Sequence, residues 1–218
     1  MHISYPTAPC SLLTITKSNT IAQEPFRWET TSEAARRIIN VRYTLLAYTY
    51  TLFHHANTAG LPVLRALAWE FPNDASLAAV ETQFLSGPAI LVTPVLVPLV
   101  TTVQGVFPGV AQGTRWYDYY TLAEVHAAPG ENVTLAAPLV SQPVHVRGGF
   151  IIPTQKPGNT TKTTRQSDWS LLVALDKQGN AEGDLYLDDG VSLVQAATKN
   201  VKVCPPFVVK SYFAWRVC

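Results

Sequence analysis

Charged side chains are scarce in this chain of 218 residues. It holds 16 lysines and arginines against 15 aspartates and glutamates, which makes 14% charged residues and a formal net charge of +1. A domain that binds nucleic acid presents a basic stripe or patch to the phosphate backbone. The balance of charge therefore argues against a nucleic-acid partner.

Long apolar runs are also missing. The most apolar stretch is residues 88–100 (PAILVTPVLVPLV), which is interrupted by Pro94 and Pro98. It is shorter than the about 20 residues that a membrane helix needs, so we expect sheet strands here and no membrane partner. The N-terminus has neither the basic start nor the apolar core of a signal peptide, and none is expected in this chain.

Cysteine and cofactor motifs are few. Cys10, Cys204 and Cys218 are widely spaced, and none has a second cysteine or a histidine at ligand spacing, so no metal site is predicted. Gly148 and Gly149 are not followed by a helix pattern, which argues against a phosphate-binding loop. No nucleophile-elbow motif accompanies the serines, and no cofactor is expected.

Residues 30–60 have the pattern of a long helix. Thr30 and Glu33 stand at the spacing of a capping box, and apolar or small residues then recur close to the 3.6-residue period. Gly60 and Pro62 provide a C-terminal stop. At 1.5 Å per residue such a helix would be about 40 Å long, so we expect it to bend or to be split.

Residues 62–71 are apolar on both faces and predict a strand covered on both sides in a parallel sheet. Arg65 breaks the pattern. Because an unpaired buried charge costs several kcal/mol, Arg65 should pair with a carboxylate or lie at a strand end. Glu70 would stand at the C-terminal end of the strand, where we expect it to pair with Arg65 or with a loop N–H rather than to act in catalysis.

The chain beyond residue 75 turns mainly into strands. A short helix is expected over residues 75–85, capped by Asn73 or Asp74 and ended by Gly87. Apolar segments then alternate with Pro-Gly and Gly-Gly turn signals. The expected strands are residues 89–97, 101–107, 116–120, 132–136 and 143–152. A two-layer antiparallel sandwich explains this spacing.

A polar loop at residues 154–167 indicates a boundary, and a further hairpin is expected behind it. Its strands would be residues 169–176 and 184–188, joined by a turn at residues 178–180. The adjacent Asp189-Gly190 is a second hairpin signal.

Five motifs follow one another along the chain. They are RYTLLAYTYTLFHHANTAGLPVLRALAWEFPND (residues 42–74), QFLSGPAILVTPVL (83–96), RWYDYYT (115–121), LAAPLVSQPVHVRGGFIIPTQ (135–155) and GDLYLDDG (183–190). In this order they resemble the C-terminal portion of glycoside hydrolase family 31, the α-glucosidase family. Five motifs in order are far more specific than any one of them. Upstream of Gln23, however, the Arg-Asn-His motif that members of the family carry is absent.

The resemblance implies a mixed α and β fold, mainly β. It consists of the C-terminal remnant of a (β/α)8 TIM barrel, an antiparallel β-sandwich and part of a second β-domain. The implied segments are an unmatched N-terminal segment (1–22), the barrel remnant (23–87), the proximal sandwich (88–153), a partial distal β-domain (154–203) and an unmatched tail (204–218).

The resemblance also implies a reaction. Hydrolysis of an α-glucosidic bond with retention needs two carboxyl groups about 5 Å apart. In the family both are aspartates on the fourth and sixth barrel strands, which would lie before residue 1. We therefore expect no catalytic and no substrate-binding residue in this chain, and no activity of the chain alone. The complete protein would be secreted and would release α-linked glucose from maltose-like or starch-derived substrates, without a metal or organic cofactor.

The carboxylates that are present have structural interpretations. Asp188 and Asp189 are adjacent, so on a strand they would point to opposite faces, and a hairpin or Asx-turn role is favoured. Asp118 could pair with Arg115. The flanking aromatic residues are expected to face a sandwich core more readily than a sugar; they are Trp116, Tyr117, Tyr119 and Tyr120.

Structural roles are also expected for the histidines and for Arg147. His54 and His55 lie near a helix end, where the dipole favours an imidazolium, and their spacing is not that of metal ligands. His145 is expected in a core strand, hydrogen-bonded, with Arg147 near the interface with the barrel. Arg65, Glu70 and Arg147 are thus the structural candidates.

Two sequons, Asn132-Val-Thr and Asn159-Thr-Thr, are typical of surface loops in a secreted glycoprotein.

Two further interpretations remain open. The chain could be a non-catalytic β-rich module that binds glycans or associates with the missing barrel portion, because unsatisfied barrel edges within residues 23–84 favour a partner. It could also be a truncated or frame-shifted gene product, with unmatched segments at both ends that hold all three cysteines.

Overall fold

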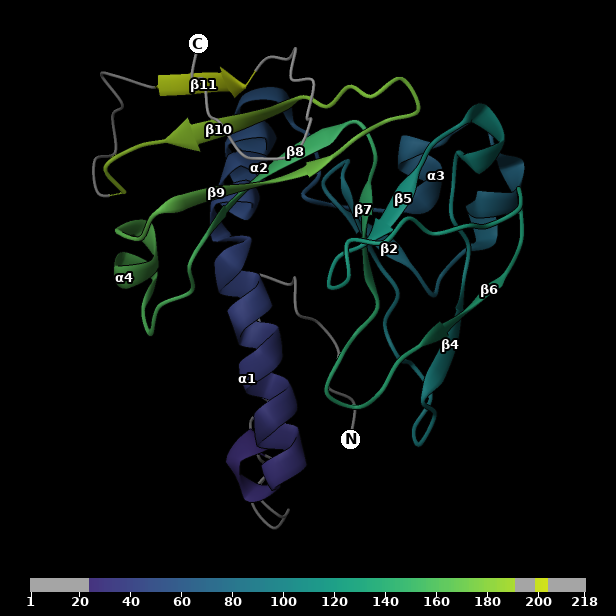
Figure 1. The fold of residues 1–218 in the computed structure, drawn as a ribbon, viewed down its shortest axis with the longest axis horizontal. Helices are drawn as coiled ribbons and strands as arrows, with labels where there is room; N and C mark the ends of the chain where they lie inside the picture. Colours follow the sequence, from purple (N-terminus) through teal and green to yellow (C-terminus); the bar gives the residue numbers. More distant parts are fainter. Residues whose placement is uncertain (1–23, 191–198, 204–218) are drawn as a thin grey trace.

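Two helices in line lead into a set of antiparallel sheets in the computed structural model, which describes residues 24–190 and 199–203 (Figure 1). The helical elements are η1 (Pro25–Arg27), α1 (Glu29–Thr44), α2 (Leu46–Ala59), α3 (Leu67–Glu70), η2 (Ala75–Ala79), η3 (Val110–Gln112) and α4 (Thr161–Arg165). The strands are β1 (Leu64–Arg65), β2 (Phe84–Ser86), β3 (Ile90–Val92), β4 (Thr102–Gly105), β5 (Trp116–Asp118), β6 (Val133–Ala136), β7 (Val144–Arg147), β8 (Phe150–Gln155), β9 (Trp169–Ala174), β10 (Gly183–Leu187) and β11 (Lys199–Val203). Cys10, Cys204, Cys218 and the segments 1–22 and 204–218 lie outside the described residues.

The long helix is split, as its length suggested. α1 and α2 meet at the buried Leu45, whose backbone leaves the helical region, and α2 ends at Gly60 with a φ of 69°. The prediction of a capping box at Thr30 and Glu33 was wrong. The helix begins at Glu29, before Thr30, and Glu33 pairs with Arg37 at 2.9 Å instead of reaching back to the cap.

The strand predicted for residues 62–71 is much shorter than expected. Only Leu64 and Arg65 of this range form a strand, and after the extended Ala66 the helical turn α3 follows. In α3, Leu67 is buried whereas Trp69 is 58% exposed, so only one face of this helical turn packs against the core. A short apolar run does not distinguish helix from strand. The prediction that this strand belongs to a parallel sheet was also wrong, because β1 pairs antiparallel with β2.

The helix predicted for residues 75–85 ends early. Asp74 caps η2 as expected, with its Oδ1 accepting the N–H of Ser76 at 3.1 Å, but residues 84–86 form β2. Gly87 therefore does not end a helix. Its φ is 59°, and a Cβ there would lie 2.6 Å from a methyl carbon of Leu52, so only glycine lets α2 approach the sheet this closely.

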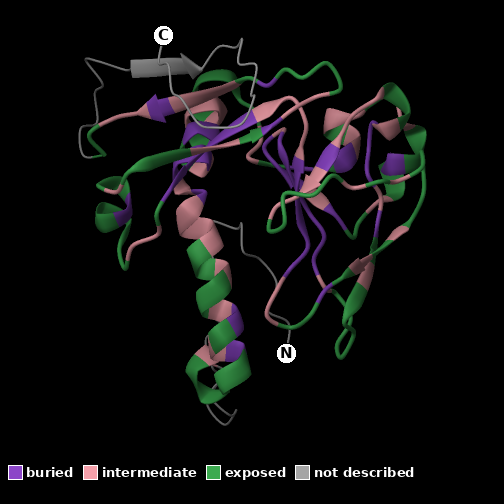
Figure 2. Ribbon diagram, viewed as in Figure 1, coloured by how far each residue is buried: buried purple, intermediate pink, exposed green. Residues whose placement is uncertain are grey.

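The main sheet has the order β1-β2-β3-β7-β5, and every neighbouring pair is antiparallel. Successive side chains of a strand point to opposite faces. Ile90 and Val92 accordingly pack toward α2, whereas Leu91 packs toward Trp116 on the other face. Both faces of the sheet are apolar, and Figure 2 shows its strands as the most buried part of the molecule.

Three two-stranded sheets surround the main sheet: β4–β6, β8–β9 and β10–β11. The hairpin predicted between residues 169–176 and 184–188 is wrong, because β9 pairs with β8 and β10 with β11. The turn at Gly148-Gly149, where Gly149 has a φ of 94°, directs the chain from β7 into β8 beside β9. Paired strands also cross two of the expected boundaries: β2–β3 spans residues 87 and 88, and β8 spans residues 153 and 154.

The described residues thus form a mixed α and β fold that is mainly antiparallel sheet. α2 lies against β8 and β10, and α1 extends away from the sheets (Figure 1). None of the described helices combines the length and apolarity needed to cross a bilayer.

Candidate functional site

Two arginines converge on one glutamate where β1, α3 and β7 meet. The Arg65 guanidinium donates a hydrogen bond to the Glu70 carboxylate, and its Nε donates to the carbonyl oxygen of Pro62 at 2.8 Å. Arg147 Nη1 lies 3.5 Å from the other carboxylate oxygen of Glu70. The side chains of Arg65, Glu70 and Arg147 are 7%, 14% and 22% exposed. One largely buried carboxylate therefore joins segments almost eighty residues apart.

Arg147 is held by aromatic rings as well. Its guanidinium carbon lies 4.5 Å from the ring centre of Phe71 and 5.5 Å from that of Phe150, within the range of a cation–π contact. Burial lowers the pKa of Arg147, and the negative charge of Glu70 opposes this shift. The cluster of Arg65, Glu70 and Arg147 is a structural clamp.

Glu70 does not stand where the sequence placed it. It lies on the helical turn α3 and not at the C-terminal end of a strand. Its carboxylate is engaged by two arginine side chains, one on each carboxylate oxygen. This arrangement suits a positioning role and not proton transfer.

The predicted pair of Asp118 and Arg115 was wrong. Asp118 Oδ1 accepts the backbone N–H groups of Tyr120 at 2.9 Å and Thr121 at 2.7 Å, and so closes the turn behind β5. Arg115 Nε instead lies 3.4 Å from Glu124 Oε1. Side-chain bonds from Asp118 to the backbone of its own turn take the place of the ion pair with Arg115.

The aromatic residues around Asp118 mostly serve the core. Trp116 is 1% exposed and its Nε1 donates to the Pro108 carbonyl at 2.9 Å, so it has no free face for a sugar ring. Tyr117 donates to the Leu175 carbonyl at 2.7 Å. Burial raises the pKa of Tyr119 to about 12, whereas Tyr120 is 44% exposed.

Asp188 closes a turn, as the sequence suggested. Its Oδ1 accepts the N–H of Gly190 at 2.9 Å, and it also binds Arg165 Nη2 at 3.3 Å and the Tyr50 hydroxyl. The hydrogen bond to Asp188 raises the pKa of Tyr50 to about 12. The Asp188 carboxylate thus joins α2, α4 and the end of β10. The neighbouring Asp189 is exposed.

The two adjacent histidines face β10, which the sequence reasoning missed. His55 Nε2 lies 2.7 Å from Asp184 Oδ2, and the His54 ring stacks on Tyr186 with centroids 3.9 Å apart. The alternation of Asp184, Tyr186 and Asp188 was a signal that these side chains share one face of a strand. Among the described residues no three histidine, cysteine or acidic side chains are grouped as metal ligands.

His145 lies in the core strand β7, as expected, but its hydrogen bonding is incomplete. The residue is 3% exposed, and Nδ1 has no hydrogen-bond partner in the described part of the chain. The ring meets Phe107 edge-on, with centroids 4.8 Å apart. Burial lowers the pKa of His145 to about 4, so the ring is neutral at physiological pH.

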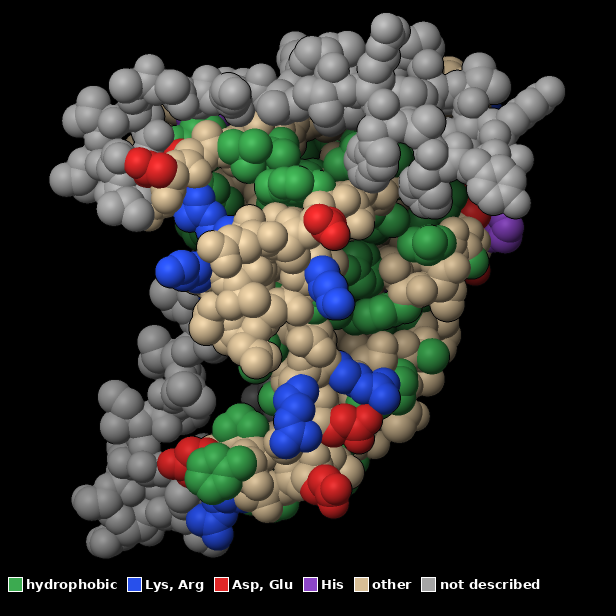
Figure 3. Space-filling view, turned by 60° about the vertical axis from the view of Figure 1, so that its left-hand side comes forward, with side chains coloured by type: hydrophobic (Ala, Val, Ile, Leu, Met, Phe, Trp, Pro, Cys, Tyr) green, Lys and Arg blue, Asp and Glu red, His purple; other side chains and the backbone are tan. Residues whose placement is uncertain are grey.

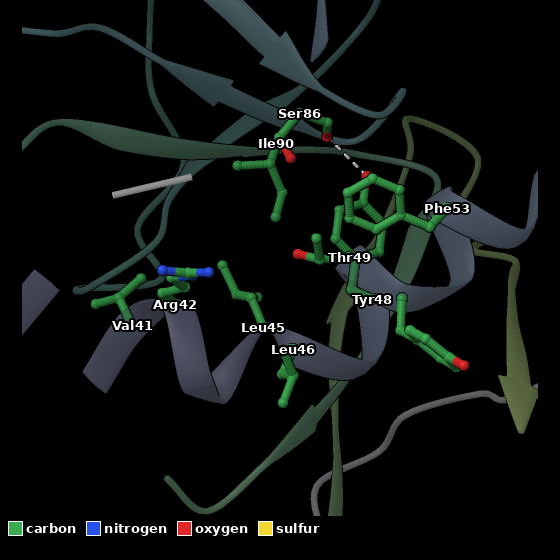
Figure 4. A pocket seen from close by; sticks show the side chains of 10 residues that line it. Val41, Arg42, Leu45, Leu46, Tyr48, Thr49, Phe53, Ser86 and Ile90 are labelled. Carbon is green, nitrogen blue, oxygen red and sulfur yellow. Dashed lines mark hydrogen bonds between the residues drawn. The ribbon is translucent and has the colours of Figure 1, made fainter. Parts of the chain in front are cut away.

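Two pockets in the described part of the chain have no pair of carboxylates in their linings. A pocket of about 110 Å³ opens between α1, α2 and the main sheet, and Figure 4 shows it bounded by Leu45, Phe53 and Ile90, with the Tyr48 hydroxyl bonded to the Ser86 carbonyl at 2.8 Å. A second pocket of about 190 Å³ lies between β5 and β9, and Asp118 is its acidic lining residue. On the face shown in Figure 3, basic and acidic side chains are interspersed with apolar ones.

Comparison with known proteins identifies the family. The family model "Glycosyl hydrolase family 31 C-terminal domain" matches residues 60–152. The chain is 57% identical over 183 residues to the α-glucosidase of Aspergillus niger and 55% identical over 181 residues to that of Aspergillus oryzae. The chain belongs to glycoside hydrolase family 31, in its C-terminal portion. The matched region includes Arg65, Glu70 and Arg147 of the clamp.

The family 31 relatives are much longer than the aligned region. The two alignments cover 84% and 83% of this chain but only 19% and 18% of the relatives. Among solved structures, the Tris-bound glucosidase II α subunit has a TM-score of 0.72 and 30% identity over 77% of this chain and 18% of that chain. A Flavobacterium johnsoniae family 31 dextranase has a TM-score of 0.69 and 28% identity over 77% of this chain and 20% of its own.

Replacing Glu70 with alanine should destabilise the fold strongly. It leaves two largely buried arginines without a counter-charge, and removing one partner of a buried pair costs about 3–5 kcal/mol. We expect Glu70→Ala to lower the free energy of unfolding in urea by about 3 kcal/mol. Glu33→Ala is the matched control, because its pair with Arg37 is exposed and such pairs contribute at most about 1 kcal/mol. Equal losses in the two variants would refute the clamp.

The buried His145 should make stability depend on pH. Its pKa is about 4 in the folded chain against 6.5 ordinarily, so the unfolded chain binds the extra proton between these values. The resulting stability is complete above about pH 6.5 and is lost as the pH falls toward 4, by about 3 kcal/mol. In urea titrations over this window, His145→Leu should lose stability less steeply than the wild type. The exposed His126→Leu is the control, and parallel wild-type and His145→Leu curves would contradict the assignment.

Proposed function

We propose that this chain forms the C-terminal part of an α-glucosidase-like hydrolase that releases α-linked glucose from maltose-like or starch-derived oligosaccharides. The supporting observation is the 57% identity to an α-glucosidase over most of the chain. The reaction requires carboxyl groups and water, and no metal or organic cofactor is invoked.

Within this hydrolase, residues 23–87 would complete the (β/α)8 barrel, residues 88–153 would form the proximal sandwich and residues 154–203 part of a distal β-domain. The order of α1, α2 and β1 supports the barrel assignment. β1 is an end strand of the main sheet, so in the described part of the chain one of its edges is free to pair with a further strand. The clamp at Glu70 then links β1, through Arg65, to β7 of the same sheet, through Arg147.

The catalytic carboxylates would be supplied from outside this chain. Retaining hydrolysis needs two carboxyl groups about 5 Å apart beside the scissile bond. The pocket beside α2 is lined by no aspartate or glutamate, and the pocket beside β9 has Asp118, whose Oδ1 is engaged in a turn. We infer that the isolated chain associates with the remaining part of the enzyme but does not itself hydrolyse glucosides.

A second candidate function is that of an association module without catalysis. It is favoured by apolar side chains exposed on and before α1: Phe26 is 76%, Trp28 40% and Ile39 51% exposed. Apolar surface of this kind is stabilised when a partner covers it. Binding of glycans has less support, because Trp116 and Tyr117 are committed to the core.

The purified chain should show no hydrolysis of a chromogenic α-glucoside above a buffer blank. The A. niger α-glucosidase serves as the positive control, and a mock preparation from the same host measures contaminating activity. Turnover that elutes with the chain and exceeds the mock preparation would overturn the assignment of the catalytic groups to another part of the protein.

A further inference from the structure

Two exposed asparagines stand in acceptor sequons for N-linked oligosaccharides. Each lies two residues before a threonine, in Asn132-Val133-Thr134 and Asn159-Thr160-Thr161. Both asparagines are exposed, and neither side-chain amide has a hydrogen-bond partner among the described residues. The sequence pattern alone does not reveal this exposure, since a sequon in a buried strand would have no room for a sugar.

Asn132 is exposed and lies immediately before β6. Val133 and Leu135 pack against the core around Trp116, whereas Thr134 is exposed. Because strand side chains alternate between faces, Asn132 shares the exposed face with Thr134. The turn before it is closed by the N–H of Ala128, which donates to Glu131 Oε2 at 2.7 Å. The asparagine is thus held outward by a fixed turn and a strand.

Asn159 precedes the N-cap of α4. The Thr160 hydroxyl accepts the N–H of Thr163 at 3.1 Å, and the Gly158 N–H donates to Thr164 Oγ1 at 3.0 Å. The loop is therefore secured on both sides of Asn159, and Thr161 is exposed beside it. An added sugar would meet solvent and displace no packed side chain.

We propose that Asn132 and Asn159 each carry an N-linked oligosaccharide when the chain passes through a secretory pathway. The donor is an oligosaccharide linked to a polyprenyl pyrophosphate. The amide Nδ2 forms a C–N bond to C1 of the first sugar, the C1–O bond to the pyrophosphate breaks, the lipid pyrophosphate leaves with the electron pair, and the amide gives up one proton. No oxidant or reductant is involved.

The oligosaccharide at Asn132 would also protect an open strand edge. In the described part of the chain β6 pairs only with β4, so its other edge has unpaired backbone groups. Such edges are templates for pairing with another chain. A bulky hydrophilic group at the start of β6 obstructs that approach.

The test is expression of the full chain behind a secretion leader in a eukaryotic host, with intact-mass measurement before and after endoglycosidase treatment. Both the medium and the membrane-enclosed fraction are analysed, so that poor export does not hide modification. We expect two oligosaccharides on the wild type, one on Asn132→Gln, one on Asn159→Gln and none on the double variant. Asn180→Gln, an exposed asparagine outside any sequon, should keep both.

A second set of variants separates recognition of the sequon from damage to the fold. Thr134→Ala and Thr161→Ala keep the asparagines and should each lose one oligosaccharide, whereas Thr134→Ser and Thr161→Ser should keep it. An unmodified wild type overturns the proposal, and a wild type with a single oligosaccharide overturns it for the site left bare. Because the readout is mass and not hydrolysis, these outcomes are independent of whether the complete protein is an α-glucosidase.

Discussion

The carboxylate of Glu70 is the contact on which the arrangement of this chain depends. Two arginines from different parts of the chain, Arg65 and Arg147, are buried against it. Charges withdrawn from water are tolerated only when they are paired, so the clamp holds Glu70 of α3 between the Arg65 side chain of β1 and the Arg147 side chain of β7. The chain between Arg65 and Arg147 must therefore bring the second arginine back to Glu70. The antiparallel sheet with the order β1-β2-β3-β7-β5 achieves this.

The second constraint is a sheet with two apolar faces. One face takes α2, where Gly87 allows the close approach of Leu52 and the Tyr48 hydroxyl binds the Ser86 carbonyl. The other face takes the core around Trp116. Polar contacts then attach β10 to α2, through His55 with Asp184 and through Tyr50 with Asp188. The carboxylates of Glu70, Asp184 and Asp188 are thus used as structural partners and turn closures.

Much of the local structure could be predicted from the sequence. The stop at Gly60, the cap at Asp74 and the turn at Asp188 depend on neighbouring residues only, and each is present. The mainly antiparallel β character also follows from alternation and turn signals. The five motifs in order predicted the family correctly, which no single residue could do.

The errors lie where distant segments compete. Residues 62–71 are apolar enough for a buried strand, but only Leu64 and Arg65 pair with β2, and the helical turn α3 carries Glu70 to the two arginines. β9 pairs with β8 although the turn at residues 178–180 leads from β9 toward β10, and no local signal distinguishes the two pairings. Arg115 could reach either Asp118 or Glu124, and the turn behind β5 decided the choice. Partners at long range are set by packing that a single sequence does not display.

We propose that this chain completes a hydrolase whose catalytic carboxylates lie elsewhere. The most direct measurement is co-expression of the chain with the part of the A. niger α-glucosidase that precedes the aligned segment, followed by co-purification and an α-glucoside assay. We expect the two portions to co-purify and to hydrolyse the glucoside together, while neither portion hydrolyses it alone. A stable, folded complex without hydrolysis, or hydrolysis by this chain alone, would contradict it.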